Sequence, residues 1–358
     1  MPQTGIHYLT YQEMMEKTNN MKTPFGLIGR ELDDSEEFIN DLPLVPASDQ
    51  DYDLGSFYEN WKKDKHSSLA DFQSPYFSST FDDYSRKDFM FLRKSAITMK
   101  RNDYRKSEAD MEAYRWEATQ ITIKDIIKDC ADDFVHGNPE KDSRHALGLE
   151  TRFNMITDME GVVKSGAYTG KVNPYITLDA GGTSAKNGKL TSVYLLIPST
   201  SGVCRIYPSK GSFVGGIQYK PGVWFDAEEQ DPVSGNTGYI QKRVDYLDIC
   251  TGLSFRNRRA GIRIANIDYS TEEGIKNFIY KYYEAVEAIK DCSVKGTPIL
   301  YANRKMRVEL KKYFNDRKYP TSISVAKPEE VMNMRFTIDG EIPIKPNEHI
   351  QTTENAIA

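Results

Sequence analysis

Hydrophobic side chains recur with helical spacing in one long stretch of the first half of the chain. Between residues 107 and 136 they repeat at close to 3.6-residue intervals, and Gly137-Asn138-Pro139 follows as a stop signal. The residues of this face are Met111, Tyr114, Ala118, Ile123, Ile126, Ile127, Cys130 and Phe134. A helix of that length would extend about 45 Å at 1.5 Å per residue. We therefore expect a strut.

Shorter apolar runs in the middle of the chain are typical of strands. We expect strands at residues 191–197, 203–207, 239–249 and 262–267. The link at 198–202 is rich in turn-forming residues, so the first two strands are predicted to form a hairpin.

Two more helices and a second hairpin are predicted toward the C-terminus. Residues 270–273, Ser-Thr-Glu-Glu, fit a capping box ahead of an amphipathic helix that ends before Gly296. A further helix follows over residues 306–314, and Asp339-Gly340 predicts the turn of a closing hairpin.

The first 105 residues lack the apolar periodicity of a segment that forms its own core. Between residues 57 and 91 aromatic side chains are scattered among Ser, Asp and Lys without a steady period. So polar a segment cannot bury its rings by itself, and they must pack on the rest of the chain or on another chain. We expect an arm followed by an extended loop or hairpin.

Composition favours a folded protein with much surface. The chain has 358 residues, which at roughly 150 residues per domain is about two domains. Its net charge of −5 with 28 % charged residues excludes a disordered or supercharged chain. Only 39 % of residues are hydrophobic, and this together with the many aromatic residues fits an elongated or assembling protein.

Charge is unevenly distributed along the chain. Residues 31–60 contain ten acids and no Lys or Arg, whereas residues 86–106 contain eight bases against two acids. Such runs are most often solvated faces. The alternative is that acidic and basic segments of neighbouring subunits attract one another, which would make assembly sensitive to salt.

The sequence contains no complete motif for catalysis or for binding a metal or cofactor. The glycine-rich stretch 182–189 has five residues between its glycines where a phosphate loop has four, and the Asp49, Asp51 and Asp53 run has Leu54 where a calcium loop needs glycine. We expect His136 to cap the long helix or contact backbone at its end. The dispersed cysteines and the absence of a signal or membrane segment are typical of a reduced, intracellular protein.

A set of short motifs carries a resemblance to a known family. They are Gly137-Asn138-Pro139 after the long helix, Gly148-Leu149-Glu150-Thr151-Arg152, and the runs at 191–196, 206–212, 252–256, 262–268 and 338–344. In this order they resemble the major capsid proteins of tailed double-stranded-DNA bacteriophages, most of all the short-tailed phages related to epsilon fifteen. The resemblance covers about residues 130–358.

The resemblance implies an α+β fold of the Hong Kong 97 type. Five parts are expected: an N-terminal arm at 1–56, an extended loop at 57–106, a peripheral domain with the spine helix at 107–184, an axial domain at 185–320, and a C-terminal return to the peripheral domain at 321–358.

The resemblance also implies a function without catalysis. The chain would assemble with itself into pentamers and hexamers of an icosahedral head shell, and would need no cofactor or metal. A portal protein is the expected further partner, scaffolding and decoration proteins stay open, the packaged DNA would be contacted non-specifically, and no membrane is involved. Assembly would take place in the host cytoplasm, and the product would be the virion capsid.

Aromatic and basic side chains are the candidates for subunit contacts. They are Trp61, Phe72, Tyr76, Phe77, Phe81, Tyr84, Arg93, Lys94, Arg256, Arg258 and Arg259. The last three fit ion pairs within the chain or between subunits better than a nucleic-acid patch, since so few residues cannot define an electrostatic groove. Alternatives for the whole chain are the shell of an encapsulin-like nanocompartment, a tail or decoration protein, and an enzyme of unfamiliar type.

Overall fold

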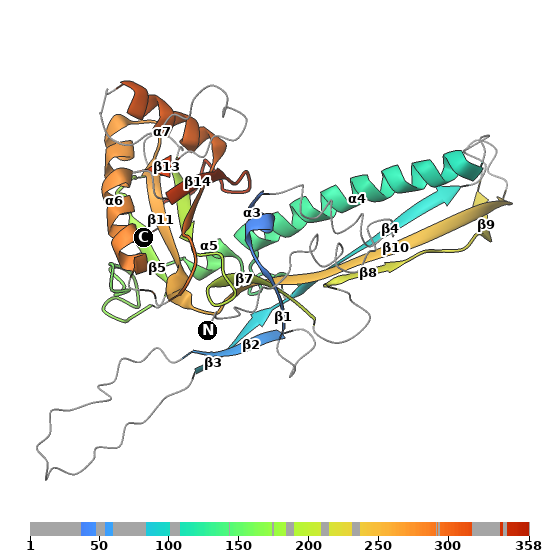
Figure 1. Ribbon diagram of the computed structural model, residues 1–358, viewed down its shortest axis with the longest axis horizontal. Helices are drawn as coiled ribbons and strands as arrows, with labels where there is room; N and C mark the ends of the chain where they lie inside the picture. The colour runs from blue at the N-terminus through green and yellow to red at the C-terminus, as the bar shows by residue number, and fades with distance from the viewer. Residues whose placement is uncertain are drawn as a thin grey trace, which may run out of the picture.

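The computed structural model shows two lobes joined side by side, one long and one compact (Figure 1). A two-stranded ribbon, formed by β2 (Leu54–Glu59) and β3 (Tyr84–Phe89), leaves their junction. The structure describes residues 37–47, 54–59, 84–100, 108–142, 144–173, 175–183, 190–208, 215–230, 237–290, 292, 294–316, 337–338 and 342–357.

The long lobe is a six-stranded sheet with one long helix along it. The helix, α4 (Glu108–His136), confirms the predicted strut almost to the residue. The sheet has the order β1-β7-β10-β4, with β8 and β9 also paired to β10. Its strands are β1 (Leu44–Pro46), β4 (Phe91–Lys100), β7 (Val203–Tyr207), β8 (Ile217–Lys220), β9 (Phe225–Gln230) and β10 (Thr237–Phe255).

The compact lobe is a second six-stranded sheet, of order β13-β14-β12-β6-β11-β5, flanked by α6 (Glu272–Lys290) and α7 (Arg304–Asp316) (Figure 1). Its strands are β5 (Ile176–Asp179), β6 (Leu190–Leu196), β11 (Gly261–Asp268), β12 (Ile299–Ala302), β13 (Thr337–Ile338) and β14 (Ile342–Pro346). Short helices α3 (Glu37–Asp41) and α5 (Leu149–Arg152) and the 3₁₀ turn η2 (Arg258–Ala260) complete the described elements. The predicted α+β class is confirmed.

The predicted hairpin of the strands at 191–197 and 203–207 is wrong, although both strands exist. β6 pairs with β11 and β12 in the compact sheet, whereas β7 pairs with β1 and β10 in the long sheet. Each strand has a partner on both of its edges. Accordingly β6 is buried along its whole length and β7 along nearly all of it. The link at 198–202 therefore carries the chain from one sheet to the other.

The lobes interleave segments that the expected boundaries keep apart. β4, which falls within the expected extended loop at 57–106, pairs with β10 over ten residues in the long sheet. Strands β7, β8, β9 and β10, all within the expected axial domain, also lie in the long sheet. The predicted closing hairpin is confirmed, because β13 and β14 pair antiparallel. β14 also pairs with β12 of the compact sheet. His349, which follows β14, contacts His136 of α4. Periodicity locates elements, but it does not show which sheet they join.

The start of α6 lies one residue later than the capping box predicts. Thr271, and not Ser270, accepts from the backbone of Gly274, at 3.2 Å between Oγ1 and N. Ser270 instead donates its hydroxyl to Asp268, with an Oγ to Oδ1 distance of 2.6 Å. Because its hydroxyl bonds Asp268, Ser270 does not cap the helix.

The two ends of the described chain meet on the compact lobe. Tyr301 of β12 donates its hydroxyl to Asp41 of α3 across 2.7 Å, and Lys345 of β14 forms an ion pair with the same carboxylate. Phe38 packs edge-on against the Tyr301 ring with centroids 4.9 Å apart. The first described helix thus packs against the strands that come last in the chain.

Two glycines let backbone segments pack directly on each other where α4 ends. Gly148 donates its N–H to the carbonyl of Gly137 at 2.8 Å. A Cβ on Gly148 would lie 2.6 Å from the Gly137 nitrogen and 2.8 Å from the carbonyl oxygen of Val135. Both neighbours are backbone atoms that cannot rotate away, so the site has no room for a side chain.

We predict that Gly148→Ala destabilises the subunit by about 3 kcal/mol, because overpacked backbone contacts must open to admit the methyl group. Urea unfolding of the unassembled subunit measures this. Gly238→Ala is the matched control, since a Cβ there meets nothing within 4 Å. Equal unfolding midpoints for the two variants would contradict the close packing.

Candidate functional site: ionic clusters at the junction of the two lobes

A buried ion pair joins the ribbon, α5 and β10 at the junction. Arg152 of α5 donates from Nη2 to Asp88 Oδ1 of β3 at 2.9 Å and to the Leu253 carbonyl at 2.8 Å. Both charged side chains are fully buried. Ser254 donates its hydroxyl to the second oxygen of Asp88 at 2.8 Å. The base of the ribbon is therefore fixed to the body by a charge pair with satisfied partners.

Aromatic rings surround this pair and complete its burial. The Arg152 guanidinium lies 5.0 Å from the Phe255 ring centroid, and Nη1 donates to the Tyr175 hydroxyl at 3.2 Å. Phe153 and Phe255 meet edge-on with centroids 5.7 Å apart. A buried ion pair adds little net stability because desolvation opposes the attraction, but losing one partner is costly. The pair specifies geometry more than it stabilises.

A second buried cluster holds the C-terminal segment on the compact sheet. Arg263 of β11 donates from Nη2 to Glu354 Oε2 at 2.9 Å, and Ser192 of β6 donates to the same oxygen at 2.5 Å. Burial raises the pKa of the Glu354 carboxyl even though Arg263 opposes this. Arg263 also donates to the Phe153 carbonyl at 3.0 Å, so this cluster borders the first.

A third cluster fixes α4 on the long sheet. Arg115 of α4 donates from Nε to Asp245 Oδ2 of β10 at 2.6 Å, and the Tyr219 hydroxyl of β8 donates to that oxygen at 2.8 Å. Burial alone would raise the pKa of Asp245, but hydrogen bonds from Gly222 and Arg115 lower it. Burial, with help from Asp245, raises the pKa of Tyr219 to about 12.

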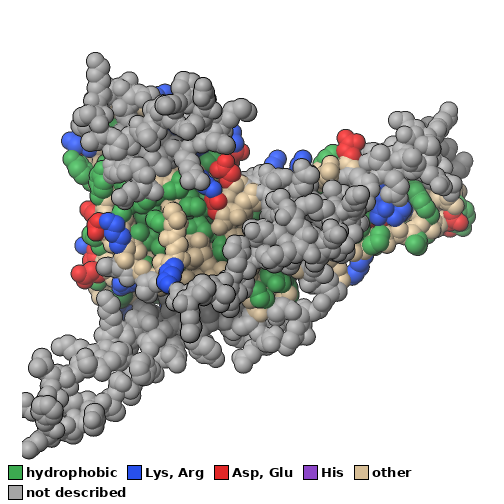
Figure 2. Space-filling view, viewed as in Figure 1, with side chains coloured by type: hydrophobic (Ala, Val, Ile, Leu, Met, Phe, Trp, Pro, Cys, Tyr) green, Lys and Arg blue, Asp and Glu red, His purple; other side chains and the backbone are tan. Residues whose placement is uncertain are grey.

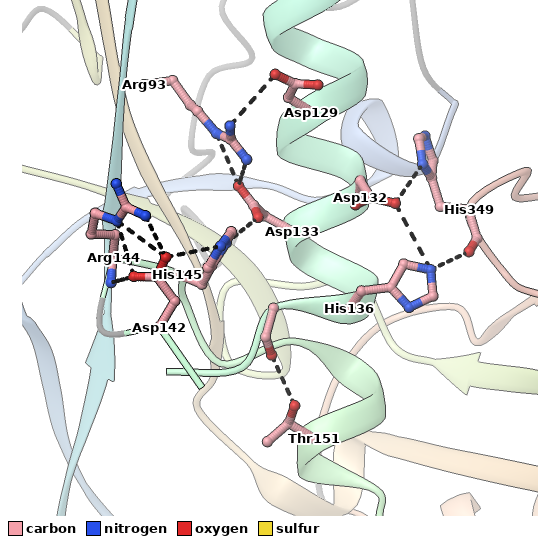
Figure 3. Close-up of polar contacts among 11 residues, drawn as sticks. Arg93, Asp129, Asp132, Asp133, His136, Asp142, Arg144, His145, Thr151 and His349 are labelled. Atoms are coloured by element: carbon pink, nitrogen blue, oxygen red, sulfur yellow. Dashed lines mark hydrogen bonds and ion pairs between the residues drawn. The ribbon is translucent and has the colours of Figure 1, made fainter. Parts of the chain in front are cut away.

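The last turn of α4 carries acidic residues on two sides (Figure 3). On one side Asp133 accepts from Arg93 Nε at 3.0 Å and faces His145 Nδ1 at 2.6 Å. On the other side Asp132 faces two histidines, His136 and His349, at 3.8 and 3.5 Å. These contacts connect β4, the loop after α4 and the C-terminal segment to one helix end.

His136 contacts backbone at the end of α4, as the sequence predicts. Its Nε2 lies 2.7 Å from the carbonyl oxygen of His349, which comes from the far end of the chain (Figure 3). Its Nδ1 lies 2.7 Å from Glu150 Oε2 of α5. The tertiary partner could not be foreseen, because it is 213 residues away.

The predicted subunit-contact residues fall into two groups. Trp61, Phe72, Tyr76, Phe77 and Phe81 lie outside the described residues, and of Tyr84 only the backbone pairing with Glu59 is described. The basic candidates are described. Arg93 pairs within its own chain and Lys94 is exposed, while Arg258 lies 5.9 Å from the Tyr175 ring centroid. Arg256 and Arg259, which lie close to Arg258 in the sequence, are half-buried.

The buried pairs themselves were missed by sequence reasoning. Asp88 sits among charged residues and has no local signal. Arg263 has one, since it is a lone cation flanked by Ile262 and Ile264 in a mainly apolar strand. Charged residues inside such runs are almost never buried without a partner, so Arg263 predicts a buried acid.

Several large apolar side chains are exposed on the subunit (Figure 2). On the long sheet they include Leu92 and Tyr246, with exposures of 45 % and 51 %. Both residues point away from α4, because their strand neighbours Arg93 and Asp245 bond to the helix side. On the compact lobe Tyr280 and Tyr283 of α6 are exposed. Such rings are typical of surfaces that another chain covers.

Among the described residues no group of His, Cys, Asp and Glu could hold a metal ion. In the same part of the chain, no helix has the length and apolar character needed to cross a membrane.

Comparison with known proteins connects this architecture to phage capsids. A family model described as major capsid protein GP7 matches residues 95–358. The structure of bacteriophage Epsilon15 is similar with a TM-score of 0.59 at 15 % identity, covering 89 % of this chain and 88 % of that chain. The bacteriophage JBD30 capsid gives 0.46 at 10 % identity, covering 86 % and 88 %. No curated protein sequence matches.

We predict that Arg152→Met destabilises the subunit by about 3–5 kcal/mol, because Asp88 is left buried without its cation. Urea unfolding measures the loss. Arg144→Met serves as control: its pair with Asp142 is exposed, and no measurable change is expected. Adding Asp88→Leu to Arg152→Met should recover most of the loss. A single variant as stable as the parent would contradict the role of the pair.

Proposed function

Because the chain belongs to the major capsid protein GP7 family, we propose that it assembles into pentamers and hexamers that close an icosahedral shell around phage DNA. As a major capsid protein it is the repeated subunit of a phage head shell and a component of the virion. The family match over residues 95–358 carries the proposal. That the chain catalyses no reaction, and assembles in the host cytoplasm, belongs to the same proposal.

The subunit has the mechanical features that such a shell requires. Head-to-tail contacts between copies close into rings when each contact repeats the same rotation. Clusters around Arg115, Arg152 and Arg263 fix the parts of one subunit to each other, so the contact geometry repeats from copy to copy. Weak individual contacts then suffice, since many neighbours hold each subunit.

The ribbon is proposed to reach a neighbouring subunit. Its β2 and β3 strands leave the junction, and the residues between them carry Trp61, Phe72, Tyr76, Phe77 and Phe81. In this proposal these aromatic residues, together with Tyr84 at the end of β3, contact a neighbouring copy of the subunit. Exposed apolar side chains such as Tyr246 are candidate receiving surfaces.

Further partners follow from the shell. A portal protein would occupy one vertex, and scaffolding and decoration proteins are further candidates. The packaged DNA would touch the inner wall without sequence readout, and the net charge of −5 keeps a shell of many copies from gripping it tightly.

We predict that replacing residues 60–83 by Asn-Gly leaves a folded subunit that forms no closed shells. Glu59 and Tyr84 lie directly opposite in the β2–β3 register, so a two-residue turn can join them without disturbing the ribbon. Negative-stain microscopy shows the particles, and circular dichroism checks the fold. Normal shells from this variant would refute the role of the ribbon.

We also predict that assembly weakens as salt rises. Ten acids lie within residues 31–60 and eight bases within 86–106. Asp41 and Arg93 pair within the subunit, and attraction between the exposed charges that remain is screened beyond about 8 Å at physiological ionic strength. Light scattering against sodium chloride concentration measures shell yield. A yield that stays constant from low to high salt would show that these segments do not pair between subunits.

Negative-stain microscopy of the purified protein, combined with absorbance of its particles at 260 and 280 nm, tests the function as a whole. Shells of one size that take up nucleic acid in the presence of the phage packaging machinery support the proposal. Shells filled with cargo protein would favour a nanocompartment, and single globules at every concentration would end the proposal.

A further inference from the structure

The C-terminal segment of residues 347–357 runs along the compact lobe as a strap. The Ile350 carbonyl accepts from Asn303 Nδ2 at 2.7 Å, and the Gln351 carbonyl accepts from the Thr191 hydroxyl at 2.7 Å. Further along, Glu354 joins Arg263, and the backbone of Ile357 pairs with the Asn266 amide at 2.8 and 3.0 Å. The strap is thus bound to the compact sheet at several points.

One residue of the strap also reaches the long lobe. The His349 carbonyl meets His136 Nε2, and His136 is the final residue of α4 (Figure 3). His349 also lies 3.5 Å from Asp132 through its Nδ1. The strap therefore spans the junction between the lobes, and its hold on α4 depends on a small group of side chains.

The partners of His136 define its protonation. Nε2 faces a carbonyl oxygen and Nδ1 faces a carboxylate oxygen, both at 2.7 Å. A carbonyl and an ionised carboxylate only accept hydrogen bonds, whereas a neutral imidazole has one N–H to donate. Both bonds exist together only when the ring is a doubly protonated imidazolium.

The charged groups around His136 favour that cation. They are Glu150 from α5, Asp132 from α4 itself, and the His349 side chain from the strap, which shares Asp132. Burial alone would lower the pKa of His136, but the hydrogen bond and charge of Glu150, with the His349 carbonyl and Asp132, raise it. The carbonyl end of α4 adds to the attraction for a positive charge.

We propose that His136 is a proton-dependent bolt that holds the strap, and with it the compact lobe, to the end of the long helix. When the ring is protonated it donates to Glu150 and to the strap together. When it loses a proton, one nitrogen becomes an acceptor that faces another acceptor, and one of the two bonds breaks. Where the bond to the His349 carbonyl is the one that breaks, the strap stays on the compact sheet and its described link to α4 is reduced to the contact between His349 and Asp132.

The direction of the pH effect follows from the raised pKa. A group with a folded-state pKa above its unfolded value stabilises the fold fully below the unfolded value of about 6.5, and that stabilisation is lost as pH rises through the folded value. The bolt is therefore closed in mild acid and opens on the alkaline side. This inference concerns the single subunit and goes beyond the shell proposed above.

Nuclear magnetic resonance of the full-length, unassembled subunit tests the bolt directly. The Cε1 proton of His136 is followed from pH 5 to 9, with its signal assigned by its absence in His136→Gln. We expect a midpoint above that of free histidine, and a lower midpoint in Glu150→Gln. A wild-type midpoint at or below the free value would overturn the proposal. If His136→Gln does not fold, the shift caused by Glu150→Gln assigns the signal.

Hydrogen exchange of the strap gives the conformational readout. After correction for the intrinsic exchange rate, protection of the His349 amide, which donates to Asn347 Oδ1 within the strap, should fall as pH passes through the His136 midpoint, while protection within α6 stays constant. His145→Gln is the matched control and should keep this behaviour, because His145 faces Asp133 and does not touch the strap. Strap protection that is equal on both sides of the midpoint would show that His136 is no bolt.

Discussion

The buried pair of Arg152 and Asp88 is the constraint on which the arrangement of the subunit depends. It lies where the ribbon, α5 and β10 meet, and each of its polar atoms has to find a partner because water is excluded. Apolar packing alone would tolerate small rotations of these segments against one another. Directional bonds to the Leu253 carbonyl and the Ser254 hydroxyl do not, so the pair sets the direction in which the ribbon leaves the body.

The local sequence pattern was enough to predict the helices and strands, but it was not enough to predict which distant strands pair. The period of α4 and its Gly137 stop predicted that helix to within a residue, because both signals lie inside the segment. β6 and β7 were also found, but their assignment to different sheets depends on β10 and β11, which lie far along the chain. The junction escaped for the same reason: Asp88 is 64 residues from Arg152 and looks like any charged surface residue.

Charged residues in a capsid subunit can serve two purposes: ion pairs within the subunit and contacts between subunits. Arg115, Arg152 and Arg263 are spent inside the chain, where each meets a carboxylate under cover of aromatic rings. Arg93 of β4, one of the predicted subunit-contact residues, bonds Asp133 and Asp129 of α4 in the same subunit. A basic residue in a capsid sequence is thus no sign of an interface by itself, and burial decides which of the two purposes it serves.

The contact of Asp41 with Tyr301 and Lys345 has a consequence for the order of events during synthesis. The acidic residue leaves the ribosome 304 residues before its lysine partner. At the usual rate of translation that interval is roughly 15–60 s. The compact sheet cannot complete its outer strands until β14 has been synthesised, so a shorter nascent chain lacks the finished compact sheet. The topology therefore delays contacts that need this sheet until after β14 has left the ribosome.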